Sequence, residues 1–137
     1  MEATTHVKQD KTGEPVVSRL LEPATLLRVE GIALLALSVL VYWVNGGSWL
    51  LFGALLLAPD LSMLGYLAGP KVGAAIYNAF HTYAMPAVVG ALGMVFASPV
   101  AMAVALIWFA HIGVDRTVGY GLKYPTSFKD THLQRVR

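Results

Sequence analysis

The chain has 137 residues, of which 56% are hydrophobic and only 13% charged, and its mean hydropathy is +0.61. Soluble domains are typically about 45–50% apolar and about 25% charged, so this composition excludes an ordinary soluble domain and indicates one integral membrane domain. The absence of cysteine excludes disulfides and thiolate metal sites, and the net charge of +2 is explained better by membrane orientation than by nucleic-acid binding.

In chain order, residues 1–25 are predicted to form a polar cytoplasmic arm, with a short amphipathic helix around residues 16–22 and no cleaved signal peptide. A first membrane span is expected from about Leu26 to Val44, followed by a tight turn at residues 45–48. The second span runs from about Trp49 to Ala68 and is interrupted at Pro59-Asp60.

Gly69-Pro70-Lys71 forms the next predicted turn, because proline favours the first position of a helix. A third span is expected over residues 72–96 as one segment that contains Pro86. Ser98-Pro99 caps and opens a fourth span that ends near Gly119. Residues 26–121 are thus predicted to form an all-α, up-down four-helix transmembrane bundle, with residues 122–137 as a cytoplasmic tail.

The positions of the basic residues predict the orientation. The turns at residues 45–48 and 97–99 contain no lysine or arginine, whereas all ten basic residues lie in or beside the other segments: Lys8, Lys11, Arg19, Arg28, Lys71, Arg116, Lys123, Lys129, Arg135 and Arg137. By the positive-inside rule, both termini are expected in the cytoplasm, which predicts a multi-pass protein of the cell inner membrane with the lipid bilayer as its partner.

Three polar residues are expected at one depth in the membrane. Asp60 lies ten residues before Pro70, His81 lies eleven after it, and His111 lies ten before Gly121. With a rise of about 1.5 Å per residue, all three side chains are predicted roughly 15 Å from the cytoplasmic face. Because ionisable groups inside membrane spans are costly and rare, this coincidence indicates a shared polar site.

The residue types at this depth are typical of metal ligands. Asp115 follows His111 by four residues and shares its helix face, so the candidate ligands are Asp60, His81, His111 and Asp115. Catalytic zinc usually takes three such protein ligands and keeps one position for water. Iron is the alternative, because non-haem iron also uses two histidines and one carboxylate. Asp115 either completes the ligand set or accepts a proton from bound water.

Each of these residues also has a structural interpretation. A single histidine in a span often bonds to a neighbouring helix, and Asp60 could bond backbone groups freed by Pro59. Asp115 could form a local ion pair with Arg116. Tyr77 and Asn78, about one turn before the third-span histidine, either pack or assist the site.

The C-terminal tail and the first span leave two further candidates open. The tail either folds back beneath the helices and carries His132 to the site or binds lipid headgroups through its lysines. Glu30, near the start of the first span, is expected at the membrane interface with Arg28.

Four stretches resemble a family of small bacterial four-span membrane proteins, domain-of-unknown-function family 4260. They are Pro59-Asp-Leu-Ser-Met-Leu-Gly-Tyr66, Tyr77-Asn-Ala-Phe-His-Thr-Tyr83, Ala110-His-Ile-Gly-Val-Asp-Arg-Thr-Val-Gly-Tyr-Gly-Leu-Lys-Tyr124 and Phe128-Lys-Asp-Thr-His-Leu133. The resemblance covers roughly residues 26–134 and names no activity. A looser likeness to membrane-bound, LexA-regulated predicted metal-dependent hydrolases implies ligand roles for Asp60, His81, His111 and Asp115.

The first functional hypothesis is a membrane metal-dependent hydrolase of a lipid or other amphiphile. It has Asp115 as ligand or base, and Tyr77 and Asn78 orient the substrate. A second is an electron-transfer protein whose His81 and His111 ligate a b-type haem. A third is a cofactor-free isomerase or a proton-coupled carrier, which as a carrier is expected to form a homo-oligomer. A fourth is a structural subunit whose polar residues only hold helices together.

Overall fold

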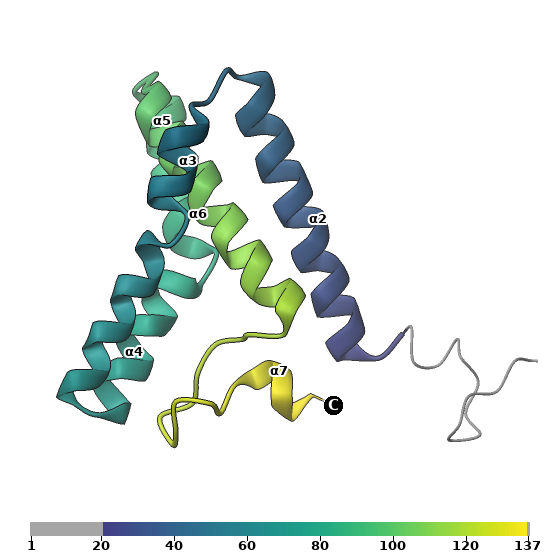
Figure 1. The fold of residues 1–137 in the computed structure, drawn as a ribbon, viewed down its shortest axis with the longest axis vertical. Helices are drawn as coiled ribbons and strands as arrows, with labels where there is room; N and C mark the ends of the chain where they lie inside the picture. The colour runs from purple at the N-terminus through teal and green to yellow at the C-terminus, as the bar shows by residue number, and fades with distance from the viewer. Residues whose placement is uncertain (1–20, 137) are drawn as a thin grey trace, which may run out of the picture.

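The computed structural model describes residues 21–136, and this part of the chain is helical with no strand (Figure 1). Its elements are the α-helices α2 (Pro23–Val44), α3 (Trp49–Leu55), α4 (Pro70–His81), α5 (Ala84–Val95), α6 (Pro99–Val118) and α7 (His132–Arg135), and the 3₁₀ helix η1 (Ala58–Ala68). Most of the amphipathic helix expected around residues 16–22, and most of the predicted arm, fall outside the described residues.

Three segments are long and apolar enough to cross a membrane: Pro23–Val44, Trp49–Ala68 and Pro99–Val118. Only 11% of the most apolar window of each of the first two is buried, and large side chains such as Leu50 and Leu67 are 85% and 89% exposed. Water-soluble monomers rarely expose continuous apolar surface on this scale. The outward-facing apolar side chains are therefore suited to lipid, and the chain is a membrane protein.

The prediction of one continuous helix over residues 72–96 is wrong. The segment consists of two twelve-residue helices, α4 and α5, which are separated at Thr82 and Tyr83. Pro86 explains the break, because a proline ring clashes with the carbonyl four residues earlier, here that of Thr82, and cannot donate a hydrogen bond to it. Thr82 accordingly has an extended backbone, with φ −92° and ψ 150°. The break places the end of α4 inside the molecule.

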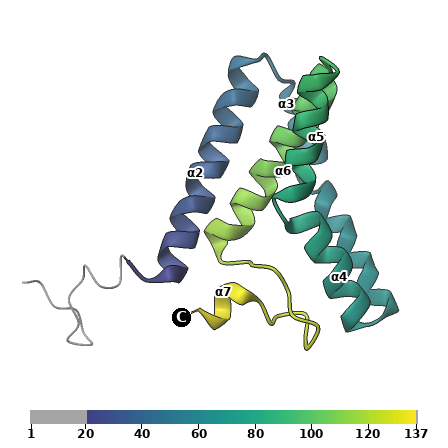
Figure 2. The same cartoon turned by 180° about the vertical axis from the view of Figure 1, so that it is seen from behind.

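The long helix α6 is the centre of the packing (Figures 1 and 2). Helix α2 packs along it, α5 lies on it, and α4 pairs with η1. Helices α2 and α6 approach closely at Gly31 and Gly113: a Cβ at Gly113 would lie 2.8 Å from the Leu35 nitrogen. The chain reverses direction after α2, after η1 and after α5. Helices α2 and α4 diverge from each other towards the end that holds α7, so the helices do not run side by side over their whole length.

The tail after α6 folds back beneath the helices (Figure 1). Lys123 and Thr131 form an isolated antiparallel bridge, and the Asn78 side chain on α4 bonds both to the Lys123 nitrogen, at 2.7 Å, and to its carbonyl, at 2.9 Å. These bonds attach the tail to the last turn of α4. The tail therefore folds back, which is one of the two expectations for it.

Candidate metal centre

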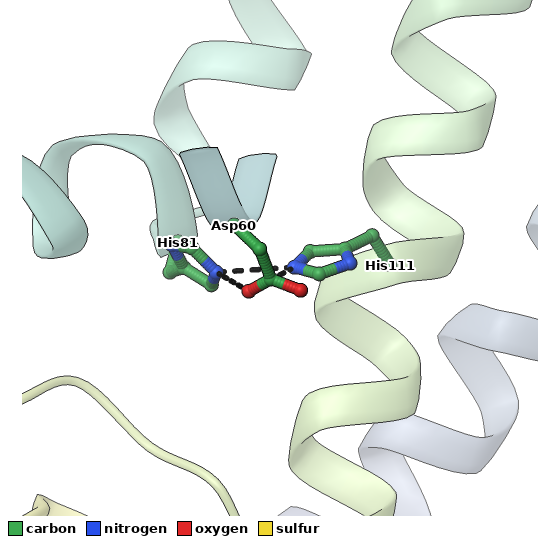
Figure 3. A group of neighbouring side chains, drawn as sticks. All are labelled: Asp60, His81 and His111. Carbon is green, nitrogen blue, oxygen red and sulfur yellow. Dashed lines mark hydrogen bonds and ion pairs between the residues drawn. The ribbon is translucent and has the colours of Figure 1, made fainter. Parts of the chain in front are cut away.

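Asp60, His81 and His111 meet in the interior of the molecule (Figure 3). Their Oδ1, Nε2 and Nε2 atoms are separated by 3.0 Å between the imidazoles and by 3.4 and 3.6 Å from the carboxylate to His81 and His111. The imidazoles are almost fully buried, whereas the Asp60 side chain is 31% exposed. The three side chains expected at one depth therefore do converge, from three different elements.

Asp115 flanks this group from one helical turn further along α6. Its Oδ2 lies 3.6 Å from His81 Nε2 and 3.9 Å from His111 Nε2, and it accepts a hydrogen bond of 3.0 Å from the Tyr77 hydroxyl. Its side chain is 13% exposed. The carboxylate is thus held beside the imidazoles by an α4 residue.

The spacing of the ligand atoms suits a single cation. Atoms arranged tetrahedrally around an ion at about 2.0–2.1 Å lie about 3.3–3.4 Å from one another. The three distances within the Asp60, His81 and His111 group, from 3.0 to 3.6 Å, bracket this value. A zinc-sized ion fits between them with little movement.

The hydrogen bond of His81 to the backbone determines which ring nitrogen is free. Its Nδ1 lies 2.9 Å from the Tyr77 carbonyl, and because a carbonyl can only accept, Nδ1 carries the proton. In the neutral ring, Nε2 then presents a lone pair to Asp60 and His111. The Tyr77 ring also stacks on the imidazole, with centroids 3.7 Å apart, which fixes its plane. Metal-binding histidines are typically oriented by such a bond from the other nitrogen.

Two of the three side chains, Asp60 and His81, lie at the ends of helical segments. Asp60 follows the buried Pro59 in the first turn of η1, just after α3 has ended. His81 is the last residue of α4, so its carbonyl has no partner within the helix. Arg116, only 4% exposed, donates from Nη2 to that carbonyl at 2.9 Å and from Nη1 to the Tyr120 carbonyl at 2.8 Å. The guanidinium therefore caps the C-terminal end of α4.

The sequence interpretation missed a second buried cation, Lys123. Its side chain is 7% exposed, and its ammonium lies 3.2, 4.5 and 5.5 Å from the ring centroids of Phe128, Tyr77 and Tyr66. Burial lowers the pKa of Lys123, while the nearby carboxylates of Asp115 and Asp60 raise it. The signal in the sequence is the mixture of lysines and aromatics in the tail, which is compatible both with folding back and with binding of lipid headgroups.

The other predicted residues lie outside the group. The Asn78 amide is occupied by the backbone of Lys123. Glu30 is exposed on α2. His132 accepts a hydrogen bond from the Leu122 nitrogen at 2.8 Å, so it stabilises the tail. Among the described residues, the group with metal-ligand spacing contains neither Glu30 nor His132.

The fold and this group define an all-helical membrane protein with a buried histidine and aspartate cluster. A family model described as a domain of unknown function, DUF4260, matches residues 24–136. The chain therefore belongs to this family, as the sequence motifs predicted. No curated protein and no solved structure matches the chain.

Proposed function

We propose that this protein is a membrane-embedded hydrolase that uses a divalent cation, zinc, to act on a lipid or another amphiphile. The observation that carries the proposal is the convergence of two imidazole nitrogens and a carboxylate oxygen within 3.0–3.6 Å, with the proton of His81 committed to Nδ1. Asp60, His81 and His111 are the proposed ligands. A divalent cation held there supplies Lewis-acid activation of a water molecule or a carbonyl group.

The neighbouring residues support distinct roles. Asp115 is assigned as the general base rather than as a ligand, because it stands beside the three-residue group and its Oδ2 is bonded to Tyr77. Tyr77 positions both Asp115, through its hydroxyl, and His81, through its carbonyl and ring. Asn78 is a positioning residue for the tail, since both polar atoms of its amide bond to the backbone of Lys123.

The same distances disfavour a bis-histidine haem. Two axial nitrogens stand on opposite faces of the porphyrin at bond lengths of about 2 Å, so they lie farther apart than the 3.0 Å between His81 and His111. A carboxylate also points to the space between them, where a porphyrin would have to lie. A cofactor-free isomerase or carrier would use the same residues for proton transfer. Measurement of the metal content distinguishes it from the metal-dependent hydrolase.

In the proposed orientation, the protein lies in the cell inner membrane and both termini are on its cytoplasmic side. The orientation rests on the basic residues beside the turn between η1 and α4 and after α6, and on their absence from the turns at the other end of the helices. The His/Asp cluster then lies in the inner-leaflet half of the membrane, where an amphiphile can enter sideways from the bilayer.

Elemental analysis of protein purified without a histidine tag tests the proposal. We expect close to one zinc or iron ion per chain in the native protein and less than a tenth of this in His81→Ala and His111→Ala. The control is His132→Gln, which removes a histidine outside the group and retains a hydrogen-bond acceptor. Equal, negligible metal in native protein and all variants would refute the metal centre and leave a direct His–His hydrogen bond in its place.

A second variant guards against misfolding of the alanine variants. The chain has no cysteine, so His111→Cys introduces a single thiol. With Co²⁺, a thiolate ligand at this position is expected to add a near-ultraviolet charge-transfer band that the native protein lacks. A cobalt-loaded variant without this band would exclude residue 111 from the ligand set.

A further inference from the structure

An apolar groove borders the His/Asp cluster on the side away from the tail. Its volume is about 170 Å³, and it is lined mainly by Leu55, Pro59, Phe80, Val104, Ile107 and Trp108. Pro59 and Phe80 are the chain neighbours of Asp60 and His81, and Ile107 precedes His111 by one turn of α6. The groove has room for part of one alkyl chain rather than for a whole lipid.

On the opposite side of the cluster lies the buried cation Lys123. Its ammonium contacts three aromatic rings, and among the residues that the structure describes no carboxylate lies within ion-pair distance of it. Tyr66 supplies one of those rings. Its hydroxyl is buried and has no hydrogen-bond partner among the described residues. A buried charge normally requires a partner, so an anion bound here would pair with the Lys123 ammonium and accept a hydrogen bond from the Tyr66 hydroxyl.

The order of these features along α6 is what links them. Val104 and Trp108 in the groove come first, His111 follows, and Asp115 comes next. Tyr77 contacts both Asp115, through its hydroxyl, and the Lys123 ammonium, through its ring. Apolar groove, polar cluster and cation therefore follow one another towards the tail. A molecule with an alkyl chain at one end and a negative charge at the other has the same order of properties.

The formal charges point the same way. With a divalent cation bound, its charge balances the two carboxylates of Asp60 and Asp115, and the buried cations Arg116 and Lys123 are left without a compensating charge. An uncharged headgroup supplies no anion to compensate this charge.

We propose that the substrate is an anionic single-chain amphiphile, with its alkyl chain in the groove at Trp108 and its phosphate or carboxylate group at Lys123. That the bound amphiphile is a substrate rests on the proposed function, but its binding is measured without turnover. It makes Lys123 a specificity-determining residue and assigns the folded-back tail to headgroup recognition.

Quenching of Trp108 fluorescence tests the inference in the full chain in neutral detergent. The chain has three tryptophans, and Trp43→Phe with Trp49→Phe leaves Trp108 as the only emitter. The probes are ω-bromododecyl phosphate, ω-bromododecanoate and the uncharged ω-bromododecyl maltoside, whose bromine quenches on contact. We expect saturable quenching by at least one anionic probe, at concentrations about tenfold or more below those of the maltoside. The two anionic probes distinguish a phosphate from a carboxylate headgroup.

Two lysine variants separate recognition from tail folding. Lys123→Met is expected to remove the preference for the anionic probe, whereas Lys123→Arg retains the charge and the preference. The backbone bonds to Asn78 are available in both variants because they use main-chain atoms. Lys129→Met, at an exposed position of the tail, is the matched control and should bind like the native protein.

Equal affinity for charged and uncharged probes, or an anion preference that survives Lys123→Met, would overturn the inference. Metal content measured on the same sample keeps the two proposals apart. A metal-free protein that still prefers the anionic probe through Lys123 contradicts the metal centre and supports the binding site. A metal-bearing protein without that preference supports the centre and contradicts the site.

Discussion

Arg116 Nη2 donates a hydrogen bond of 2.9 Å to the backbone carbonyl of His81, thirty-five residues away in the sequence. The bond joins the end of α4 to α6 inside the molecule, where both residues are buried. The position of the His81 imidazole therefore depends on a cation that does not touch it.

Replacing Arg116 by methionine should weaken metal binding although no ligand is changed. The His81 carbonyl would lose its donor, and loss of a residue that orients a ligand typically costs about 10–100-fold in metal affinity. Zinc competition with a chromophoric chelator measures the affinity. Arg135→Met, at a half-exposed tail residue paired with Asp130, is the control. An unchanged affinity in Arg116→Met would show that the bond does not position His81.

The two carboxylates should respond differently to the same isosteric change. Asp60→Asn removes a proposed ligand and is expected to lower zinc affinity by more than tenfold. Asp115→Asn leaves the three-residue group complete and is expected to retain most of the metal while abolishing hydrolysis of an amphiphile. Metal analysis of both variants side by side is the measurement. Comparable metal loss in both would make Asp115 a fourth ligand.

The close contact between α2 and α6 should not tolerate a side chain. Gly113→Ala places a Cβ 2.8 Å from the Leu35 nitrogen, which forces the backbones apart and is expected to cost about 1–3 kcal/mol of stability. Thermal unfolding in detergent reports it as a lower midpoint. In Gly53→Ala on α3, the new methyl group meets no atom within 4 Å, so this variant should be as stable as the native protein or slightly more so.

Acid should loosen the docked tail through His132. Burial, and then the charge of Arg116, lower the pKa of His132 below its ordinary value of 6.5. The folded tail therefore prefers the neutral ring, whose Nδ1 accepts from the Leu122 nitrogen. The contribution of His132 is complete above about pH 6.5 and is lost as the pH falls below it.

Hydrogen exchange of the Leu122 amide between about pH 7.5 and 5 measures this effect, after correction for the intrinsic pH dependence of exchange. The corrected protection should fall on acidification in the native protein. His132→Gln retains an acceptor that does not titrate, so the fall should be smaller in that variant. A pH dependence identical in both proteins would assign the effect to another group.

The proposed orientation predicts opposite labelling of the two ends of the helices. Because the chain has no cysteine, Asn45→Cys and Ser127→Cys each introduce one exposed thiol. An impermeant maleimide added to intact spheroplasts should label residue 45 and not residue 127. In inverted inner-membrane vesicles the pattern should reverse. Labelling of both positions from one side would contradict the topology.

The sequence alone determined the features that depend on local composition. Hydropathy located the apolar segments because lipid contact requires continuous apolar surface, and the regular rise of a helix was sufficient to predict that Asp60, His81 and His111 meet at one depth. The prediction of one continuous helix is wrong at Thr82, because Pro86 breaks the turn that precedes it. That break is nevertheless what frees the His81 carbonyl for Arg116.

Tertiary structure decided the contacts between residues far apart in the chain. Whether Arg116 faces Asp115 or the end of α4, and whether His132 or Lys123 lies beneath the cluster, depends on the rotation of each helix and the path of the tail. Neither is encoded in periodicity, because a side chain's partner is set by the packing of several elements at once. Depth along a span is a one-dimensional property that a sequence carries, whereas the direction in which a side chain points is fixed only when the helices pack.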